Sequence, residues 1–241
     1  MRILALDTAS GLCSAALWVD GDVATRELPT ARDHARQILP MVQSLLAEAG
    51  IALAAVDAIA FGRGPGSFTG LRIAASVTQG LAFGADLPVL PVSDLRALAQ
   101  QALWQHALAA KGSAAAPTRI LACLDARMNE VYAALYPVPS SGLVADAPSE
   151  QVLSPAALVD LSQSGGGDRA AWIAAGKGLS AYAVALAPLG LLAGRIWPDA
   201  EPRAREVAIL GAADFARGAA LPAEAAVPVY LRDQVAQPSR A

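Results

Sequence analysis

Apolar and polar positions follow two different periods along the first half of the chain. Short apolar runs predict strands at residues 3–6, 13–20, 23–28, 56–61 and 87–91. Apolar residues at three- and four-residue steps predict helices at residues 33–49, 67–84 and 93–108. Asp33 is expected to cap the first helix, Gly50 to end it, and Pro40 to kink it or divide it in two. This order of elements indicates an α/β fold with a mixed sheet flanked by helices.

The second half of the chain begins like the first. Leu6-Asp7 precedes Ala15-Ala16-Leu17 with the same spacing by which Leu124-Asp125 precedes Ala133-Ala134-Leu135. Each copy reads as an apolar strand ending at an aspartate, a turn and a second strand, so the match indicates a duplicated lobe or, in an alanine-rich chain, coincidence. We expect lobes at residues 1–110 and 111–241, a linker at 111–118, and loops at 137–155 and 162–169. A tail helix near residues 203–217 could pack back on the first lobe, and a strand is expected at 227–231.

Composition narrows the classes of protein that fit. The 241 residues are 55% hydrophobic and 16% charged, which excludes general disorder because such a chain can bury a large core. The net charge is −3 and no basic run occurs, so the chain alone lacks the footprint of a tight nucleic-acid binder. Cys13 and Cys123 lie far apart, which fits neither a disulfide framework nor a zinc site. No segment reads as a signal peptide or a membrane span, so we expect a cytoplasmic protein without a membrane partner.

The two aspartate turns are candidates for a nucleotide cleft. Two lobes that each begin with strand, aspartate, turn and strand resemble the actin/hexokinase/Hsp70 ATPase superfamily, in which backbone N–H groups of the turns hold phosphates. The first turn runs from Asp7 to Gly11 and has threonine and alanine where kinases of that plan carry glycine. One interpretation is a vestigial nucleotide cleft formed by Asp7, Thr8, Ser10 and Asp125. The alternative is that both aspartates end strands and hydrogen-bond their own turns.

A glycine-rich motif lies between the strand at 56–61 and the helix that follows it. Its candidate site residues are Gly62, Gly64, Pro65, Gly66, Ser67, Thr69 and Gly70. A strand that enters a helix through several glycines predicts an anion site at the helix N-terminus or, alternatively, a tight turn. The motif is not a Walker loop, because no Lys-Ser/Thr pair follows, and it is not a G-x-S-x-G elbow. Ser67 is expected to cap the helix and not to act as a nucleophile.

A longer resemblance is carried by GRGPGSFTGLRIAASVTQGLA, which starts at Gly62. This segment resembles the signature of the bacterial TsaB (YeaZ) family, whose members are accessory subunits in the synthesis of N6-threonylcarbamoyladenosine in tRNA. The segments ILALDTASGLCSAAL, DHARQILPMVQSLL, LPVSDLRALA, LDARMNEVYAALY and PVYLRD resemble that family in the same order. The resemblance implies a two-lobed actin/Hsp70-like (ASKHA) ATPase fold, with mixed sheets flanked by helices and a reduced second lobe.

The same resemblance implies that the chain is not an enzyme. TsaD, the catalytic relative, carries P-V-H-H-x-E-G-H after the strand that follows its glycine motif, and an H-x-x-x-H pair on one helix face binds a metal. Here Asp94 and Leu98 stand where the two histidines would be, while His34 and His106 lie elsewhere. The resemblance therefore implies no catalytic residue, no metal and no intrinsic cofactor, with ATP or ADP a ligand of the assembled complex at most.

The helices at 33–49 and 67–83 are the expected partner surface. The first carries a long apolar stripe and the second has small residues on two faces, which lets two neighbours approach closely. In the TsaB family these helices form a bundle with the matching pair of TsaD. The interface candidates are His34, Ile38, Met41, Val42, Leu45, Phe68, Leu71, Ala74, Ala75, Thr78 and Gly80.

The resemblance implies a scaffold subunit that binds TsaD and supports threonylcarbamoyl transfer to the adenosine after the anticodon, in tRNAs that read codons starting with A. A TsaE-like ATPase is expected to complete the assembly, tRNA to be met only through the complex, and the chain to form a homodimer through the same surface. The alternative is a small-molecule kinase or ATPase of the same fold. A metalloprotease-like glycoprotease is a further alternative, and the missing metal ligands count against it.

Overall fold

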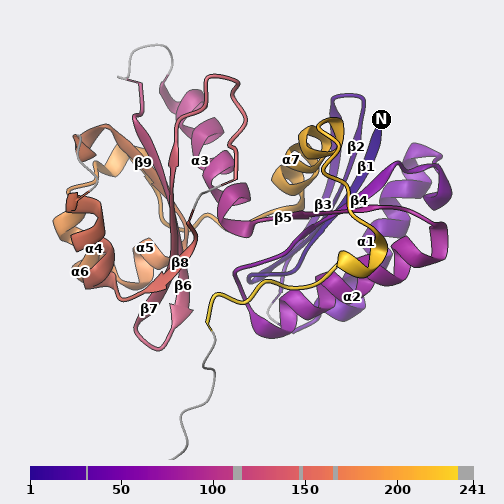
Figure 1. Cartoon of the computed structure of the whole chain (residues 1–241), viewed down its shortest axis with the longest axis horizontal. Helices are drawn as coiled ribbons and strands as arrows, with labels where there is room; N and C mark the ends of the chain where they lie inside the picture. Colours follow the sequence, from indigo (N-terminus) through magenta and orange to yellow (C-terminus); the bar gives the residue numbers. More distant parts are fainter. Residues whose placement is uncertain (31, 111–115, 147–148, 165–167, 233–241) are drawn as a thin grey trace, which may run out of the picture.

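Two five-stranded sheets form the centres of two lobes that lie side by side (Figure 1). The computed structural model describes residues 1–30, 32–110, 116–146, 149–164 and 168–232. The strands of the first sheet are β1 (Arg2–Asp7), β2 (Leu12–Val19), β3 (Asp22–Pro29), β4 (Ala58–Gly62) and β5 (Val89–Val92). Those of the second are β6 (Arg119–Arg127), β7 (Glu130–Pro137), β8 (Gln151–Leu153), β9 (Trp172–Ala175) and β10 (Ile196–Trp197).

The second sheet repeats the topology of the first. The strand orders are β3-β2-β1-β4-β5 and, read in the matching direction, β8-β7-β6-β9-β10. In each sheet the first three strands in this order pair antiparallel and the last three pair parallel. The duplication indicated by the repeated strand–aspartate–turn–strand pattern is therefore confirmed, because β1 and β6 occupy equivalent central positions.

Helices cover both faces of the first sheet. Because successive side chains of a strand point to opposite faces, Leu4 and Leu6 of β1 pack toward one side and Ile3 and Ala5 toward the other. Helices α1 (His34–Ala49) and α2 (Phe68–Ala85) cover the first side, and α7 (Ala204–Ala216) covers the second (Figure 1). The expected tail helix, α7, thus packs back on the first sheet, although β10, the strand that precedes it in the chain, belongs to the second sheet.

Helix α3 (Asp94–Ala110) packs mainly on the second sheet, although Ala97 near its start shares a core with the first sheet and α7. Its residues Leu95, Leu98 and Ala102 share a core with Ile120 and Tyr136. The expected boundary after residue 110 thus lies beyond a helix that already packs mainly with the second lobe. Helices α4 (Pro155–Ser164), α5 (Lys177–Ala181) and α6 (Ala183–Leu186) cover the opposite face of the second sheet.

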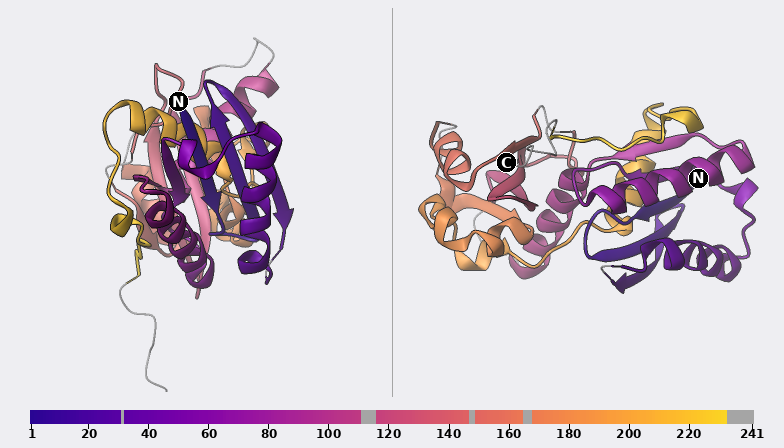
Figure 2. Two further views of the ribbon diagram at one scale, coloured as in Figure 1. Left: turned by 90° about the vertical axis from the view of Figure 1, so that its right-hand side faces the viewer. Right: turned by 90° about the horizontal axis from the view of Figure 1, so that it is seen from below.

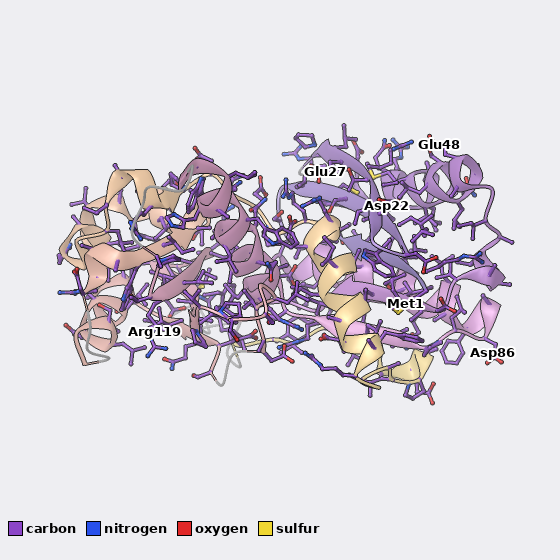
Figure 3. All side chains as sticks on the ribbon, turned by 90° about the horizontal axis from the view of Figure 1, so that it is seen from above. Met1, Asp22, Glu27, Glu48, Asp86 and Arg119 are labelled. Atoms are coloured by element: carbon purple, nitrogen blue, oxygen red, sulfur yellow. The ribbon has the colours of Figure 1, made fainter. Side chains whose placement is uncertain are left out.

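The lobes are joined through α3 and α7, which contact each other. Arg96 of α3 is buried and forms a two-pronged ion pair with Asp214 of α7, with N–O distances of 2.7 and 3.0 Å. The Arg96 guanidinium also donates to the carbonyl oxygen of Val144 at 2.7 Å. The segment between β10 and α7 makes a second crossing from one lobe to the other (Figure 2). Side chains fill the space between sheets and helices in both lobes (Figure 3).

The remaining sequence predictions have mixed outcomes. Helix α1 is continuous through Pro40, so it is not divided in two, and Gly50 ends it with a φ of 63° as expected. The Asp33 carboxylate makes no capping hydrogen bond within the described chain. The segment 227–231, expected to be a strand, forms none in the described structure. The expected loop at 137–155 contains strand β8, and helix α4 extends into the expected loop at 162–169. Residues 111–115 of the expected linker lie outside the described residues.

Short 3-10 turns complete the described fold, and they lie at Leu53–Ala55, Arg169–Ala171, Ala187–Leu189, Ala193–Arg195 and Ala223–Ala225. Among the described helices, none combines the length and apolar character that crossing a membrane requires.

Candidate functional site

The glycine motif and the first aspartate turn pack directly against each other. The N–H of Ser67 donates to the carbonyl oxygen of Ala9 at 2.7 Å, and the Thr8 hydroxyl donates to the carbonyl oxygen of Gly70, also at 2.7 Å. A Cβ at Gly66 would lie 2.5 Å from the Ala9 carbonyl oxygen, and one at Gly70 would overlap that of Thr8. These two glycines are therefore needed for backbone-to-backbone contact within the chain.

The start of α2 confirms the capping role of Ser67. Its Oγ accepts from the N–H of Gly70 at 3.5 Å. Gly64 and Pro65 are buried beside this turn, whereas Thr69 is exposed. The motif thus builds a tight turn that the chain fills with its own β1–β2 connection, which favours the tight-turn interpretation over an open anion site.

Asp7 and Asp94 form a fully buried carboxyl pair next to this turn. Asp7 Oδ1 accepts from the N–H of Ala9 at 2.8 Å, and Asp94 Oδ2 accepts from the N–H of Gly64 at 2.5 Å. The other two oxygens, Asp7 Oδ2 and Asp94 Oδ1, both lie against Gly62 and find no N–H or hydroxyl donor among the described residues. A proton held between these two oxygens satisfies both of them.

Burial controls the protonation of this pair. Because desolvation disfavours the charged form, burial raises the pKa of Asp7 to about 6. Burial and the neighbouring Asp7 charge also raise the pKa of Asp94 well above its ordinary value. The sequence did not predict this pair, because Asp7 ends β1 and Asp94 begins α3, and only the fold brings them together.

The other residues expected in the nucleotide cleft form hydrogen bonds with groups of the same chain. Asp125 repeats the geometry of Asp7, since its Oδ1 accepts from the N–H two residues on, that of Arg127, at 2.8 Å. Asp125 also accepts from the Tyr182 hydroxyl at 3.1 Å. Ser10 Oγ accepts from the N–H of Leu12 at 3.2 Å. These contacts match the alternative in which both aspartates hydrogen-bond their own turns. Among the described residues, no group of three or more histidine, cysteine, aspartate or glutamate side chains could hold a metal ion.

Most of the expected interface residues are buried inside the first lobe. Those with buried side chains are His34, Ile38, Val42, Leu45, Leu71, Ala74, Ala75 and Thr78. This corrects the sequence prediction: the apolar stripe of an amphipathic helix packs against its own sheet, so helical periodicity identified the core-facing side. Met41 is half-buried, Phe68 is 48% exposed and Gly80 is exposed, so these three remain available to a partner.

The outer face of α2 combines small residues with exposed aromatic rings. No atom of the described residues outside the helix backbone lies within 4 Å of a Cβ built at Gly80 or Gly84. Phe83, on the same stretch of helix, is 61% exposed. The interface predicted from the sequence included Gly80 but not Phe83. Once the buried side of α2 is known, the sequence shows that Phe83 lies beside two outward-facing glycines.

The chain after α7 adds to the same region. Tyr230 lies against Phe68 with ring centroids 5.5 Å apart, and the Arg72 guanidinium stacks on Phe68 at 3.8 Å. Arg72 Nε donates to the Tyr230 hydroxyl at 3.0 Å, and the N–H of Val229 donates to the carbonyl oxygen of Arg63 at 2.7 Å. The tail thus crosses the N-terminal end of α2, where its exposed aromatic ring extends the candidate surface.

The duplicated lobes and their aspartate turns define a two-lobed α/β protein of the actin/Hsp70 type. The family model for TsaD, tRNA N6-adenosine threonylcarbamoyltransferase, matches residues 28–239. The chain belongs to the TsaB (YeaZ) family within this class. The tRNA threonylcarbamoyladenosine biosynthesis protein TsaB of Escherichia coli K12 is 42% identical over 98% of this chain and 96% of its own length.

Two further relatives support this membership. The TsaB protein of Haemophilus influenzae is 48% identical over 55% of this chain and 52% of its own. The solved structure of YeaZ from Pseudomonas aeruginosa is 41% identical and superposes with a TM-score of 0.79, covering 95% of this chain and 99% of that one. The family expected from the glycine motif and the segments around it is therefore confirmed.

Proposed function

We propose that this chain is the non-catalytic partner subunit of a TsaD-type threonylcarbamoyltransferase. In this role it binds TsaD and supports transfer of the threonylcarbamoyl group to the adenosine after the anticodon, in tRNAs that read codons starting with A. The full-length similarity to TsaB supports the process. The observation that carries the partner role is the outward-facing pair formed by Gly80 in the interior of α2 and Gly84 in its last turn.

Glycine inside a helix costs roughly 0.5–1 kcal/mol relative to alanine, so an interior glycine calls for a compensating contact. Gly70, the third residue of α2, has such a contact within the chain, because the β1–β2 turn lies against it. Gly80 and Gly84 have none among the described residues. A close approach from outside the chain supplies the missing reason, and the exposed Phe83 ring adds apolar area to that contact.

The surroundings of Asp94 and Leu98 support a non-catalytic role. Asp94 is fully buried and faces Asp7, and Leu98 packs in the core of the second lobe. Neither position offers an imidazole or an accessible ligand where TsaD-like chains carry the histidine pair. The kinase alternative needs free N–H groups at the first turn, but those of Ala9, Gly11 and Leu12 are already donated to side chains of this chain.

The remaining partners follow from this role. We expect a TsaE-like ATPase to complete the assembly in the cytoplasm, with tRNA and any ATP or ADP met through the complex and not by this chain alone. Because two copies of the α2 outer face are self-complementary about a two-fold axis, homodimer and heterodimer are expected to compete for it.

Reconstitution tests this function. TsaD from the same source, the threonylcarbamoyl donor, the TsaE-like ATPase and unmodified tRNA are assayed with and without this chain. We expect modification that depends on TsaD and rises when this chain is added, and no modification by this chain without TsaD. Modification of tRNA by this chain alone, or a TsaD activity that is indifferent to its addition, would contradict the proposal.

A further inference from the structure

The segment between β10 and α7 places a carboxylate between the two lobes. Glu201 Oε2 accepts from the N–H of Gly11, in the β1–β2 turn of the first lobe, at 2.7 Å. Its Oε1 forms an ion pair with Lys177, the first residue of α5 in the second lobe. One side chain from the crossing segment therefore binds a main-chain donor of one lobe and an ammonium group of the other.

This pair of donors has the chemistry of an anion site. A main-chain N–H in a turn and a lysine ammonium together favour a negatively charged oxygen, whether it belongs to a carboxylate or to a phosphate. Burial opposes the charged form of Glu201, yet hydrogen bonds from Lys177, Ser10 and Gly11 hold its pKa below the ordinary value. The donors thus stabilise an anion strongly enough to outweigh its desolvation.

The fold fixes the backbone at both donors. Gly11 lies at the end of the turn that packs on the glycine motif, next to the start of β2. Lys177 lies between Gly176 and Gly178, and a Cβ at Gly178 would lie 2.6 Å from Cys123 Sγ, so this turn is pressed onto β6. A cavity of about 420 Å³ lies beside Glu201, lined among others by Leu12, Trp197 and Arg203, and gives small molecules access to the carboxylate.

We propose that the Gly11 N–H and Lys177 form an anion site between the lobes, and that Glu201 occupies it as an internal ligand in place of a phosphate-class anion. The intact chain then holds its lobes together with its own carboxylate and leaves no vacancy for an external anion. When this carboxylate is removed, the same donors accept inorganic pyrophosphate.

The test compares pyrophosphate binding by four full-length proteins, using isothermal titration calorimetry at low salt. Glu201→Ala opens the site, and Glu201→Ala combined with Lys177→Ala removes its ammonium. Asp199→Ala is the matched control, because Asp199 carries the same charge, lies two residues away in the same segment and lines the same cavity, but does not bind Gly11 or Lys177. Circular dichroism checks the fold of each variant.

We expect Glu201→Ala to bind pyrophosphate roughly tenfold or more tightly than the unmodified chain, the scale of one charge-assisted contact. The double variant should lose this gain, and Asp199→Ala should bind like the unmodified chain. Equal binding by the unmodified chain and Glu201→Ala, or an equal gain in Asp199→Ala, would overturn the proposal.

A second variant keeps the test decisive if Glu201→Ala unfolds. Glu201→Gln preserves the shape, but its neutral amide oxygen is a weaker acceptor for the Gly11 N–H and leaves Lys177 without a counter-charge, so pyrophosphate should displace it. Pyrophosphate should then raise the melting temperature of Glu201→Gln and leave that of the unmodified chain unchanged. Failure of pyrophosphate to stabilise Glu201→Gln would overturn the proposal. Because no TsaD or tRNA is present in either experiment, these outcomes are independent of the partner role proposed above.

Discussion

Replacing Asp94 by asparagine should make the protein more stable at neutral pH and change how its stability depends on pH. In the folded protein, Asp94 and Asp7 share a buried site in which two of the four carboxyl oxygens have no donor among the described residues. An asparagine at position 94 keeps an oxygen for the Gly64 N–H and offers its amide N–H to Asp7 Oδ2. The variant thus supplies permanently the hydrogen bond that otherwise needs a proton.

The pH dependence of the difference follows from the pKa of Asp94, because Asp7 is present in both proteins. Burial and the neighbouring Asp7 charge raise the pKa of Asp94 well above its ordinary value of 3.8, so the folded protein binds this proton more tightly than the unfolded chain does. The resulting stabilisation is complete below the unfolded value and is lost as the pH rises toward the folded pKa. Each pH unit in this range costs the unmodified chain up to about 1.4 kcal/mol.

The pH dependence of stability that comes from Asp94 is opposite in sign to the one that comes from Glu201. The pKa of Glu201 is lowered, because its hydrogen bonds from Lys177, Ser10 and Gly11 outweigh its burial, so its stabilisation is lost on acidification. Glu201 is present in both proteins and cancels in their difference. The unfolding free energy of Asp94→Asn, relative to the unmodified chain, should therefore increase between about pH 4 and about pH 7, by up to about 1.4 kcal/mol for each pH unit.

Urea unfolding at several pH values measures this difference, with tryptophan fluorescence and circular dichroism as probes. Asp86→Asn is the control, because Asp86 is an exposed carboxyl at the end of α2, far from the buried pair, and asparagine tolerates its positive φ of 53° (Figure 3). Its stability should run parallel to that of the unmodified chain. A difference between Asp94→Asn and the unmodified chain that stays constant with pH would refute the shared-proton account.

Gly70→Ala should lower the unfolding free energy by about 3 kcal/mol because its Cβ would overlap the Thr8 carbonyl oxygen, while Gly80→Ala on the same helix should raise it by roughly 0.5–1 kcal/mol. Urea midpoints that shift equally for both would contradict the assignment of inner and outer faces. Arg96→Met should lower the unfolding free energy by roughly 1.5–3 kcal/mol in the same assay, because it removes the two-pronged partner of the buried Asp214 and leaves it only the more exposed Arg217, and an unchanged midpoint would contradict this role. The chain alone should bind tRNA weakly at about 150 mM salt, because its 21 acidic residues outnumber its 18 basic ones. Tight, saturable binding in a filter assay would contradict this prediction.

The long helices were predictable from the sequence. Helices α1, α2, α3 and α7 begin and end within one or two residues of the expected positions. Helices α1 and α2 each bury one apolar stripe, whereas α3 and α7 are buried on several sides. The repeated strand–aspartate–turn–strand pattern also predicted the second lobe, since both aspartates make the same bond to their own turns.

Other elements carried too little local signal. Strands β8 and β10 have three and two residues, too few for a period, and they exist because β7 and β9 offer an edge to pair with. The expected strand at 227–231 fails because Pro228 has no N–H to donate and Val229 pairs with Arg63 through one bond only.

The candidate site was only half predictable. The glycine motif and the first aspartate turn were both identified, but their contact with each other depends on the tertiary fold. The buried pair of Asp7 and Asp94 and the crossing carboxylate of Glu201 join residues far apart in sequence, so no local pattern marks them. The apolar stripes of α1 and α2 were found correctly and assigned to the wrong partner, because the lobe's own sheet already covers them.

The partner surface is tested most directly by sedimentation of this chain with TsaD from the same source. Gly80→Arg places a guanidinium on the open face of α2, where no atom of the described residues outside the helix backbone lies within 4 Å of the added Cβ, so the variant should fold normally by circular dichroism. Ala157→Arg, at an exposed position of α4 in the second lobe, is the matched control. We predict that the unmodified chain and Ala157→Arg bind TsaD while Gly80→Arg does not. A folded Gly80→Arg that binds TsaD as tightly as the unmodified chain would contradict the account.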